Sequence, residues 1–128
     1  MTEPGTIAVK AHKLYKVFGR RAQDAVRALE AGAARKDVEN LGTAAVIDAS
    51  FEVKAGEIFV VMGLSGSGKS TLIRMLNGLL EPTSGTVTVG STNISGIPAK
   101  ELREVRRHQV SMVFQHFALM PHRTVLEN

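Results

Sequence analysis

The chain has no cysteine and no tryptophan among its 128 residues, and it has a single tyrosine. Without cysteine, a disulfide scaffold, a thiolate metal site and a cysteine nucleophile are excluded. The longest uninterrupted apolar stretch covers only residues 58–62, whereas a membrane-spanning helix needs about 20 apolar residues. The N-terminal residues show no basic segment followed by an apolar one, so we expect no secretory signal and a cytoplasmic protein.

Aspartate is also scarce, and it is confined to the first part of the chain. The three aspartates are Asp24, Asp37 and Asp48, so residues 49–128 contain none. This shortage contributes to the formal net charge of +4. The main basic cluster is interleaved with glutamates, a spacing typical of a solvated helix face; it comprises Lys100, Glu101, Arg103, Glu104, Arg106 and Arg107. Because this cluster contains no aromatic residue, we expect no nucleic-acid partner.

Hydrophobic periodicity divides the chain into strand and helix patterns. Alternation predicts strands at residues 6–18 and 47–53, and the stretch at 20–43, rich in Ala, Glu, Arg and Lys, predicts an inserted hairpin of two short helices. Residues 58–62 are apolar on both faces, which is typical of a central parallel strand. The further expected elements are a helix after residue 68, a strand at 86–89, a helix from Pro98 to about Arg107 and a strand at 110–114. The expected fold class is α/β.

The last residues have the pattern of a helix start. Thr124 and Glu127 are spaced as a capping box, which marks the first turn of a helix. The sequence ends one residue later, at Asn128. We therefore expect residues 1–128 to be the N-terminal part of one larger domain, whose helical subdomain begins at residues 124–128.

The strongest motif lies between the predicted central strand and the helix that follows it. Gly63-Leu64-Ser65-Gly66-Ser67-Gly68-Lys69-Ser70-Thr71 matches G-x-x-x-x-G-K-[ST], the Walker A phosphate loop. Its glycines let consecutive backbone N–H groups point at phosphate oxygens, and the following helix adds its positive N-terminal end. Lys69 can reach the β- and γ-phosphates, and Ser70 offers a hydroxyl oxygen to Mg²⁺. The sequence therefore predicts nucleotide binding.

The segments around this loop resemble the ATP-binding subunits of ABC transporters. The resembling segments are Gly56-Glu57-Ile58, Glu81-Pro82-Thr83-Ser84-Gly85 and Met112-Val113-Phe114-Gln115. Within that family, the loop, the insert at 20–43, Leu102-Arg103-Glu104-Val105-Arg106-Arg107 and Phe117-Ala118-Leu119-Met120-Pro121-His122 resemble the glycine betaine/proline (quaternary amine) importers. The resemblance implies a P-loop NTPase of the ABC type, present here as the N-terminal strands plus part of the parallel core sheet.

The resemblance also implies roles for individual residues. ATP would be bound by Gly63, Ser65, Gly66, Ser67, Gly68, Lys69, Ser70 and Thr71, and Mg²⁺ by Ser70 and Gln115. Gln115 resembles the Q-loop glutamine, an auxiliary residue that senses the transmembrane partner. An aromatic residue at the end of the first strand would stack on adenine; its position favours Phe18, with Tyr15 as the alternative.

The resemblance further implies partners. Residues 116–123 resemble the surface that docks a permease subunit, because their apolar run lies in a loop; a buried loop anchor is the alternative. The complete protein would pair with a second ATP-binding subunit as a homodimer, cooperate indirectly with a substrate-binding protein, and lie peripherally on the cytoplasmic face of the membrane.

Several parts that ATP hydrolysis requires in this family are missing from the sequence. No apolar strand ending in Asp-Glu follows the loop, and neither the Leu-Ser-Gly-Gly signature nor a switch histidine is present. We therefore expect hydrolysis only in a complete chain, with no catalytic residue here. Two alternatives remain at this point: a truncated fragment that binds nucleotide without turnover, and a P-loop small-molecule kinase. Fifty-odd residues before the loop, and no aspartate after it, disagree with the kinase.

Overall fold

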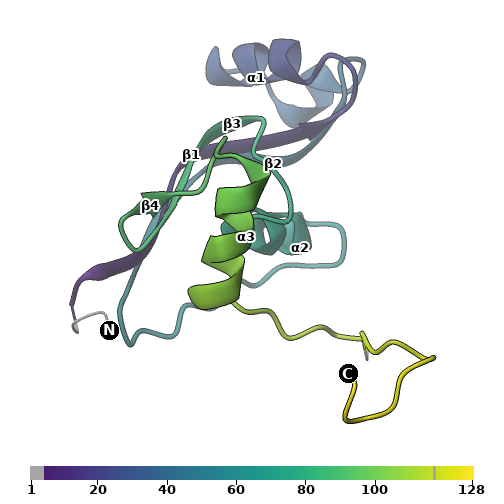
Figure 1. The fold of residues 1–128 in the computed structure, drawn as a ribbon. Coiled ribbons are helices and arrows are strands. Elements are labelled where there is room, and N and C mark those ends of the chain that lie inside the picture. Colours follow the sequence, from purple (N-terminus) through teal and green to yellow (C-terminus); the bar gives the residue numbers. More distant parts are fainter. Residues whose placement is uncertain (1–4, 117) are drawn as a thin grey trace.

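The computed structural model describes residues 5–116 and 118–128, and Figure 1 shows how its elements follow one another. Strand β1 (Ile7–Phe18) leads into helix α1 (Ala22–Glu30), the 3₁₀ turn η1 (Arg35–Val38) and strand β2 (Thr43–Lys54). Helix α2 (Lys69–Leu76), strand β3 (Ser84–Val89), the short strand β4 (Thr92–Asn93) and helix α3 (Ala99–His108) follow. Among these helices, none is long and apolar enough to cross a membrane.

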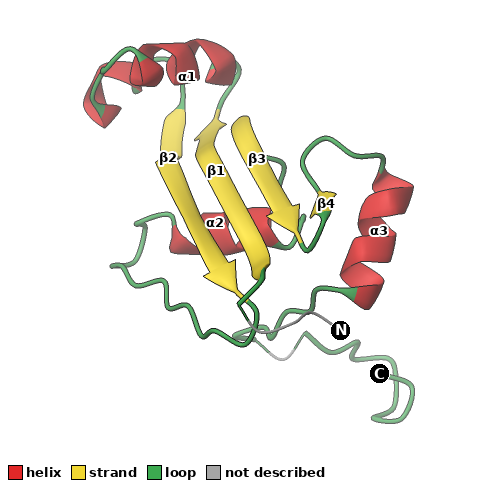
Figure 2. Ribbon diagram, turned by 90° about the vertical axis from the view of Figure 1, so that its left-hand side faces the viewer, coloured by secondary structure: helices red, strands yellow, loops and turns green. Residues whose placement is uncertain are grey.

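The strands form one antiparallel sheet in the order β2–β1–β3–β4, with α2 against one face (Figure 2). On β1, Phe18 pairs with Thr43 of β2, and Val9 pairs with Val89 of β3. The period-two alternation therefore predicts the positions of β1, β2 and β3 correctly. In this arrangement β1 is central, because it is hydrogen-bonded along both edges.

The main hydrophobic core lies between the sheet, α2 and α3. Its most buried members are Leu14 of β1, Met75 of α2 and Val87 of β3, each at most 1% exposed. Val105 extends this core to α3. Burying one such side chain contributes about 1.5–3 kcal/mol, so this cluster holds α2 at a fixed place under the strands.

A second hydrophobic cluster fixes the insert to the sheet. Val26 and Leu29 of α1 and Val38 of η1 pack against Tyr15 of β1 and Ala44 of β2. The first helix of the predicted hairpin is confirmed, whereas the second is a single 3₁₀ turn. The segment that contains η1 is short. It can form only a few i→i−4 hydrogen bonds, too few to offset the cost of helix nucleation.

The insert leaves and rejoins the sheet through two glycines in close approach. A Cβ added at Gly42 would lie 2.6 Å from the carbonyl oxygen of Phe18, and one added at Gly19 would lie 2.9 Å from the Cα of Gly42. Since real Cβ contacts are not that short, only glycine fits at these positions. The neck of the insert is therefore narrow, and it lies directly beside Phe18.

The predicted strands at 58–62 and 110–114 are not formed as hydrogen-bonded ladders among the described residues. Ile58 is 90% exposed and Met62 87% exposed, so these side chains lack the two covering layers that a central parallel strand requires. Phe59 is the exception, since its ring stacks on that of Phe51 with 4.8 Å between centroids. A β-strand is stabilised by backbone hydrogen bonds to a neighbouring strand. No such strand lies beside either segment in the described chain.

Candidate functional site

The loop at residues 63–68 reaches α2 through backbone geometry that favours glycine. Gly66 has φ +80° and Gly68 has φ +91°, both in the left-handed region. A Cβ added at Gly68 would lie 2.2 Å from the carbonyl oxygen of Ala45 on β2. The loop backbone therefore passes directly against the sheet, where no side chain larger than that of glycine fits.

The same loop closes tightly on itself. The Ser67 N–H donates to the Leu64 carbonyl at 3.0 Å, and a Cβ added at Gly63 would lie 2.3 Å from the Ser67 Oγ. The first N–H groups of α2 have no carbonyl partner within the helix, because every α-helix leaves these donors unpaired. The unpaired donors at the start of α2, directly after the loop, are of the kind that binds phosphate groups.

Lys69 and Ser70, the first two residues of α2, carry the side chains expected to meet phosphate and metal. The Lys69 Nζ donates to the Leu64 carbonyl oxygen at 3.0 Å, so its side chain is folded back over the loop. In residues 5–116 and 118–128, Lys69 forms no ion pair with a carboxylate. Its positive charge therefore remains available to an anion at the loop.

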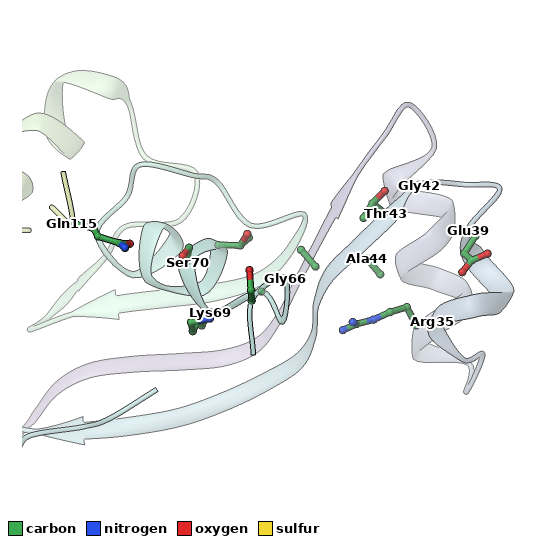
Figure 3. Close-up of a pocket in the computed structure, with 13 residues that line it drawn as sticks. Arg35, Glu39, Gly42, Thr43, Ala44, Gly66, Lys69, Ser70 and Gln115 are labelled. Carbon is green, nitrogen blue, oxygen red and sulfur yellow. The ribbon is translucent and has the colours of Figure 1, made fainter. Parts of the chain in front are cut away.

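A cavity of about 820 Å³ brings the expected site residues together (Figure 3). Ser65, Gly66, Gly68, Lys69, Ser70 and Thr71 line it, together with Gln115, which lies far from them in sequence. Gly63 and Ser67 shape the loop but do not line this cavity. The opposite wall consists of the start of β2 and of η1.

The residues in this cavity fit a nucleotide with Mg²⁺. Its volume is within the range of about 300–1,000 Å³ typical of small-molecule sites. At Gly66 and Gly68, which line the cavity, the loop has no side chain that would fill it. The Ser70 hydroxyl and the Gln115 amide carry oxygen atoms of the kind that Mg²⁺ prefers, and Lys69 carries a positive charge.

The two aromatic candidates for adenine stacking lie in different environments. Phe18 is 44% exposed at the end of β1, opposite Thr43, which lines the cavity. Its ring does not itself line the cavity, and the Lys16 Nζ lies 5.2 Å from its centroid. Tyr15 is only 6% exposed, and burial, with smaller contributions from nearby carboxylates, raises the pKa of its hydroxyl. Of the two rings, only that of Phe18 has a face open to a ligand.

The segment at 116–123 carries the residues expected to dock a permease, of which Phe117 lies outside the described residues. Leu119 and Met120 are 64% and 53% exposed, so in the described chain they do not anchor a buried loop. Beyond them, the Thr124 N–H donates to a Glu127 carboxylate oxygen at 2.9 Å, and the Glu127 N–H donates to the Thr124 Oγ1 at 3.3 Å. The capping-box hydrogen bonds are thus formed, around a turn and not a helix.

One wall of the cavity was missed by the sequence analysis: the wall formed by η1 and the start of β2, including its two charged residues. Arg35 and Glu39, in and just after η1, line the same wall as Thr43. The sequence predicts the insert as a unit, but nothing in its local pattern indicates that it reaches over a loop about 30 residues further along. Only the antiparallel pairing of β1 with β2 brings the insert there.

Comparisons with known proteins give consistent results for sequence and structure. A family model described as ABC transporter matches residues 46–128. The glycine betaine transport ATP-binding protein OpuAA of Bacillus subtilis is 52% identical over 124 residues, which are 95% of this chain and 30% of the relative. The glycine betaine/proline betaine transport system ATP-binding protein ProV of Escherichia coli is 51% identical over 124 residues, 95% of this chain and 31% of the relative.

Among solved structures, the dimeric ATP-binding cassette MJ0796 in a post-hydrolysis state bound to ADP and Pi is similar in fold. It aligns with a TM-score of 0.73 and 29% sequence identity, over 93% of this chain and 44% of the other. The chain thus spans about a third of the length of the curated relatives it matches.

Proposed function

The chain belongs to the ABC transporter family, and we propose that it contributes the ATP-binding loop of the energy-coupling subunit of an importer for glycine betaine- or proline-type osmoprotectants. The observation that carries the proposal is the cavity in which Lys69, Ser70 and Gln115 meet. The transport names of relatives about 50% identical over most of the chain support the substrate class. They give the kinase alternative no support.

In the proposed function, the chain's residues act by binding and orienting. The loop N–H groups and Lys69 hold the phosphates of ATP, and Phe18 offers its exposed ring to the adenine. Ser70 and Gln115 hold Mg²⁺, which neutralises charge on the phosphate oxygens when it is bound. Because Gln115 follows an extended segment and precedes the proposed docking residues, it connects the nucleotide site to the permease side.

We further propose that the 128 residues by themselves bind ATP without turning it over. Among the residues that line the cavity, the only carboxylate is Glu39, which lies on the insert wall, whereas Gln115 lies beside Ser70 and the loop. No described carboxylate therefore lies where it could orient a water molecule at the terminal phosphate. Hydrolysis would then depend on carboxylates of a longer chain.

The partners of the proposed subunit follow from its family. Importers of this kind use two ATP-binding subunits on a permease, and the solved relative MJ0796 is dimeric. We propose that residues 118–123, with Leu119 and Met120 exposed, contribute to the permease contact, while a substrate-binding protein acts through the permease. The protein would accordingly be held at the cytoplasmic face of the membrane by its partner.

Binding of ATP to the 128-residue chain, measured by calorimetric titration with Mg²⁺, tests the nucleotide part of the proposal. We expect saturable binding that Lys69→Ala abolishes and that Lys100→Ala, a change of the same type on exposed α3, leaves intact. Equal binding by the Lys69→Ala chain would refute it.

The substrate class is tested by replacing the matching segment of the Bacillus subtilis relative with this chain. Because the two are 52% identical there, we expect the chimera to restore glycine betaine uptake to cells that lack the relative. A chimera that is present at normal levels but takes up no glycine betaine would contradict the assignment.

A further inference from the structure

The insert places one arginine on the cavity wall that faces the phosphate loop. Arg35 lines the main cavity together with Gly66 and Lys69, and its side chain extends from the insert toward the loop (Figure 3). Arg35 also lines a second, smaller hollow of about 260 Å³, together with Ser67 and Gly68. Arg35 therefore faces the loop across both hollows.

The turn that carries Arg35 is held firmly in place. Val38 of η1 is 1% exposed within the second hydrophobic cluster. The Asp37 Oδ2 accepts a hydrogen bond from the Ala34 N–H at 2.9 Å at the start of the turn, and the Leu41 N–H donates to the Val38 carbonyl at 2.8 Å at its end. Arg35 is consequently presented to the cavity from a fixed base.

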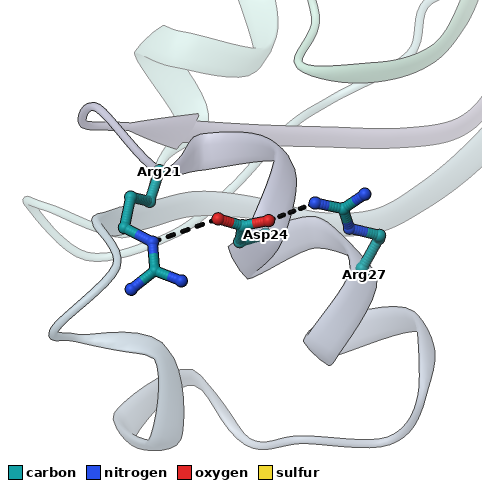
Figure 4. A network of polar contacts seen from close by, with 3 residues as sticks. All are labelled: Arg21, Asp24 and Arg27. Atoms are coloured by element: carbon teal, nitrogen blue, oxygen red, sulfur yellow. Dashed lines mark hydrogen bonds and ion pairs between the residues drawn. The ribbon is translucent and has the colours of Figure 1, made fainter.

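The Arg35 guanidinium has no carboxylate partner among the described residues. Arg21 and Arg27 of the same insert both pair with Asp24 (Figure 4), and Arg107 pairs with Glu104. The Arg35 side chain forms neither an ion pair nor a hydrogen bond with any residue in 5–116 and 118–128. An exposed, unpaired guanidinium on a cavity wall is suited to an anionic ligand, since it can donate two parallel hydrogen bonds to a phosphate.

The wall on which Arg35 lies indicates which phosphate of a bound nucleotide it would contact. In Figure 3, Gln115 and Arg35 lie on opposite sides of the loop, with Ser70 toward Gln115. Arg35 and Thr43 share the other wall, and Thr43 pairs with Phe18, the proposed adenine contact. With adenine on Phe18 and Mg²⁺ on Gln115, as proposed above, the sugar would lie on the insert side of the cavity and the terminal phosphate on the Gln115 side.

We infer that Arg35 is a nucleotide-binding residue that contacts the α-phosphate, so that the insert forms one wall of the nucleotide site. The inference rests on the proposed ATP binding. Glu39 is the other charged group on this wall, and its carboxylate opposes phosphate binding by repulsion. Removing the charge of Arg35 should therefore weaken phosphate binding, whereas removing the charge of Glu39 should not.

The test is titration of the 128-residue chain with ATP, ADP and AMP. We expect Arg35→Gln to weaken all three affinities by the same factor, about five- to tenfold, because all three ligands carry the α-phosphate. Arg35→Lys should retain an intermediate affinity, and Glu39→Gln should bind at least as tightly as the unaltered chain. Lys36→Gln is the matched control, since Lys36 is an exposed neighbour that does not line the cavity; we expect a change of less than about twofold.

Four outcomes would overturn the inference. Unchanged affinity in Arg35→Gln would exclude the contact, and an equal loss in Lys36→Gln would mean that only the overall charge of the insert matters. A loss for ATP but not for ADP would place the contact on the γ-phosphate. A loss for ATP and ADP but not for AMP would place the contact on the β-phosphate. If the unaltered chain does not bind ATP in a Lys69-dependent way, the proposed function itself fails, a result that is distinct from Lys69-dependent binding insensitive to Arg35.

Discussion

Gly68 and Ala45 are in contact through backbone alone: a Cβ at Gly68 would lie 2.2 Å from the Ala45 carbonyl oxygen. This contact joins the last residue before α2 to the third residue after Gly42, at the neck of the insert, so it fixes how closely the loop approaches β2. The shape of the cavity depends on it.

We predict that Gly68→Ala destabilises the fold by about 1–3 kcal/mol and removes ATP binding, because the new methyl group has no space and φ is +91°. Gly56→Ala is the matched control, since Gly56 has φ +80° but no atom within 4 Å of its Cβ position. Urea unfolding and ATP titration measure the two effects. Equal behaviour of the two variants would show that backbone strain, and not the contact with Ala45, decides the outcome.

A second prediction concerns Phe18. Its ring is 44% exposed beside the cavity, and stacking contributes affinity only to ligands that carry a base. Phe18→Ala should therefore weaken ATP binding about three- to tenfold, whereas Phe18→Tyr should bind nearly normally. Inorganic tripolyphosphate serves as the comparison ligand, and its affinity should be the same in all three chains. A parallel loss of tripolyphosphate binding would mean that Phe18 acts only by shaping the cavity.

A third prediction separates the proposed metal ligands from the rest of the site. If Ser70 and Gln115 hold Mg²⁺, the unaltered chain binds ATP more tightly with Mg²⁺ than in excess EDTA, and Ser70→Ala and Gln115→Ala reduce that difference by about three- to tenfold. Gln109→Ala, at the end of α3 and outside the cavity, should preserve it. Titrations in the two buffers measure the difference, which would be unchanged in Gln115→Ala if that residue is not a ligand.

Asp24 makes the insert sensitive to acid. Hydrogen bonds from Arg27 and from Arg21 (Nε to Oδ2, 3.0 Å) hold the pKa of the Asp24 carboxyl below its usual value of 3.8 (Figure 4). Because the pKa is lower in the folded state, the stabilisation is complete above the unfolded pKa and is lost as pH falls through the folded one. Unfolding at pH values from 6 down to 2.5 should show a small loss that begins below about pH 4 and is absent in Asp24→Asn.

The charges around Asp24 are exposed, so this contribution is small and screened by salt. Added sodium chloride should reduce the difference between the two chains at pH 6. Superimposable pH profiles at low salt would mean that the pairs with Arg21 and Arg27 contribute nothing to stability.

The parts of the fold that the sequence predicts well are those whose pattern is local. The alternation through β1 and β2 follows from one face packing on Leu14 and its neighbours, and the loop at 63–71 follows from a motif whose glycines have a direct steric reason. By contrast, an apolar run such as residues 58–62 predicts a strand only on the assumption that partner strands lie beside it. No partner strand lies there in the described chain, and Ile58 and Met62 are exposed.

In the candidate site, too, residues in a local motif are predicted and residues placed by long-range strand pairing are not. Lys69, Ser70 and Gln115 are predicted from motif and resemblance, and the structure brings them to one cavity. Arg35 and Glu39 were missed because an exposed charge on a short turn has no distinctive local pattern. Their place is a consequence of strand register, which pairs Phe18 with Thr43 and so carries the turn over the loop.

The insert begins and ends at one narrow neck, where Gly19 and Gly42 nearly touch. The two ends are already brought together by the pairing of β1 with β2, so loops of different length can be exchanged there at a closure cost that grows only slowly with length. Within this framework the proposed insert wall of the nucleotide site can change while the strand pairing is kept, provided that the side chains that pack on Tyr15 and Ala44 are retained. If the insert contacts nucleotide as proposed, substitutions on its surface that faces the cavity would adjust nucleotide affinity and leave the buried contacts with the sheet in place.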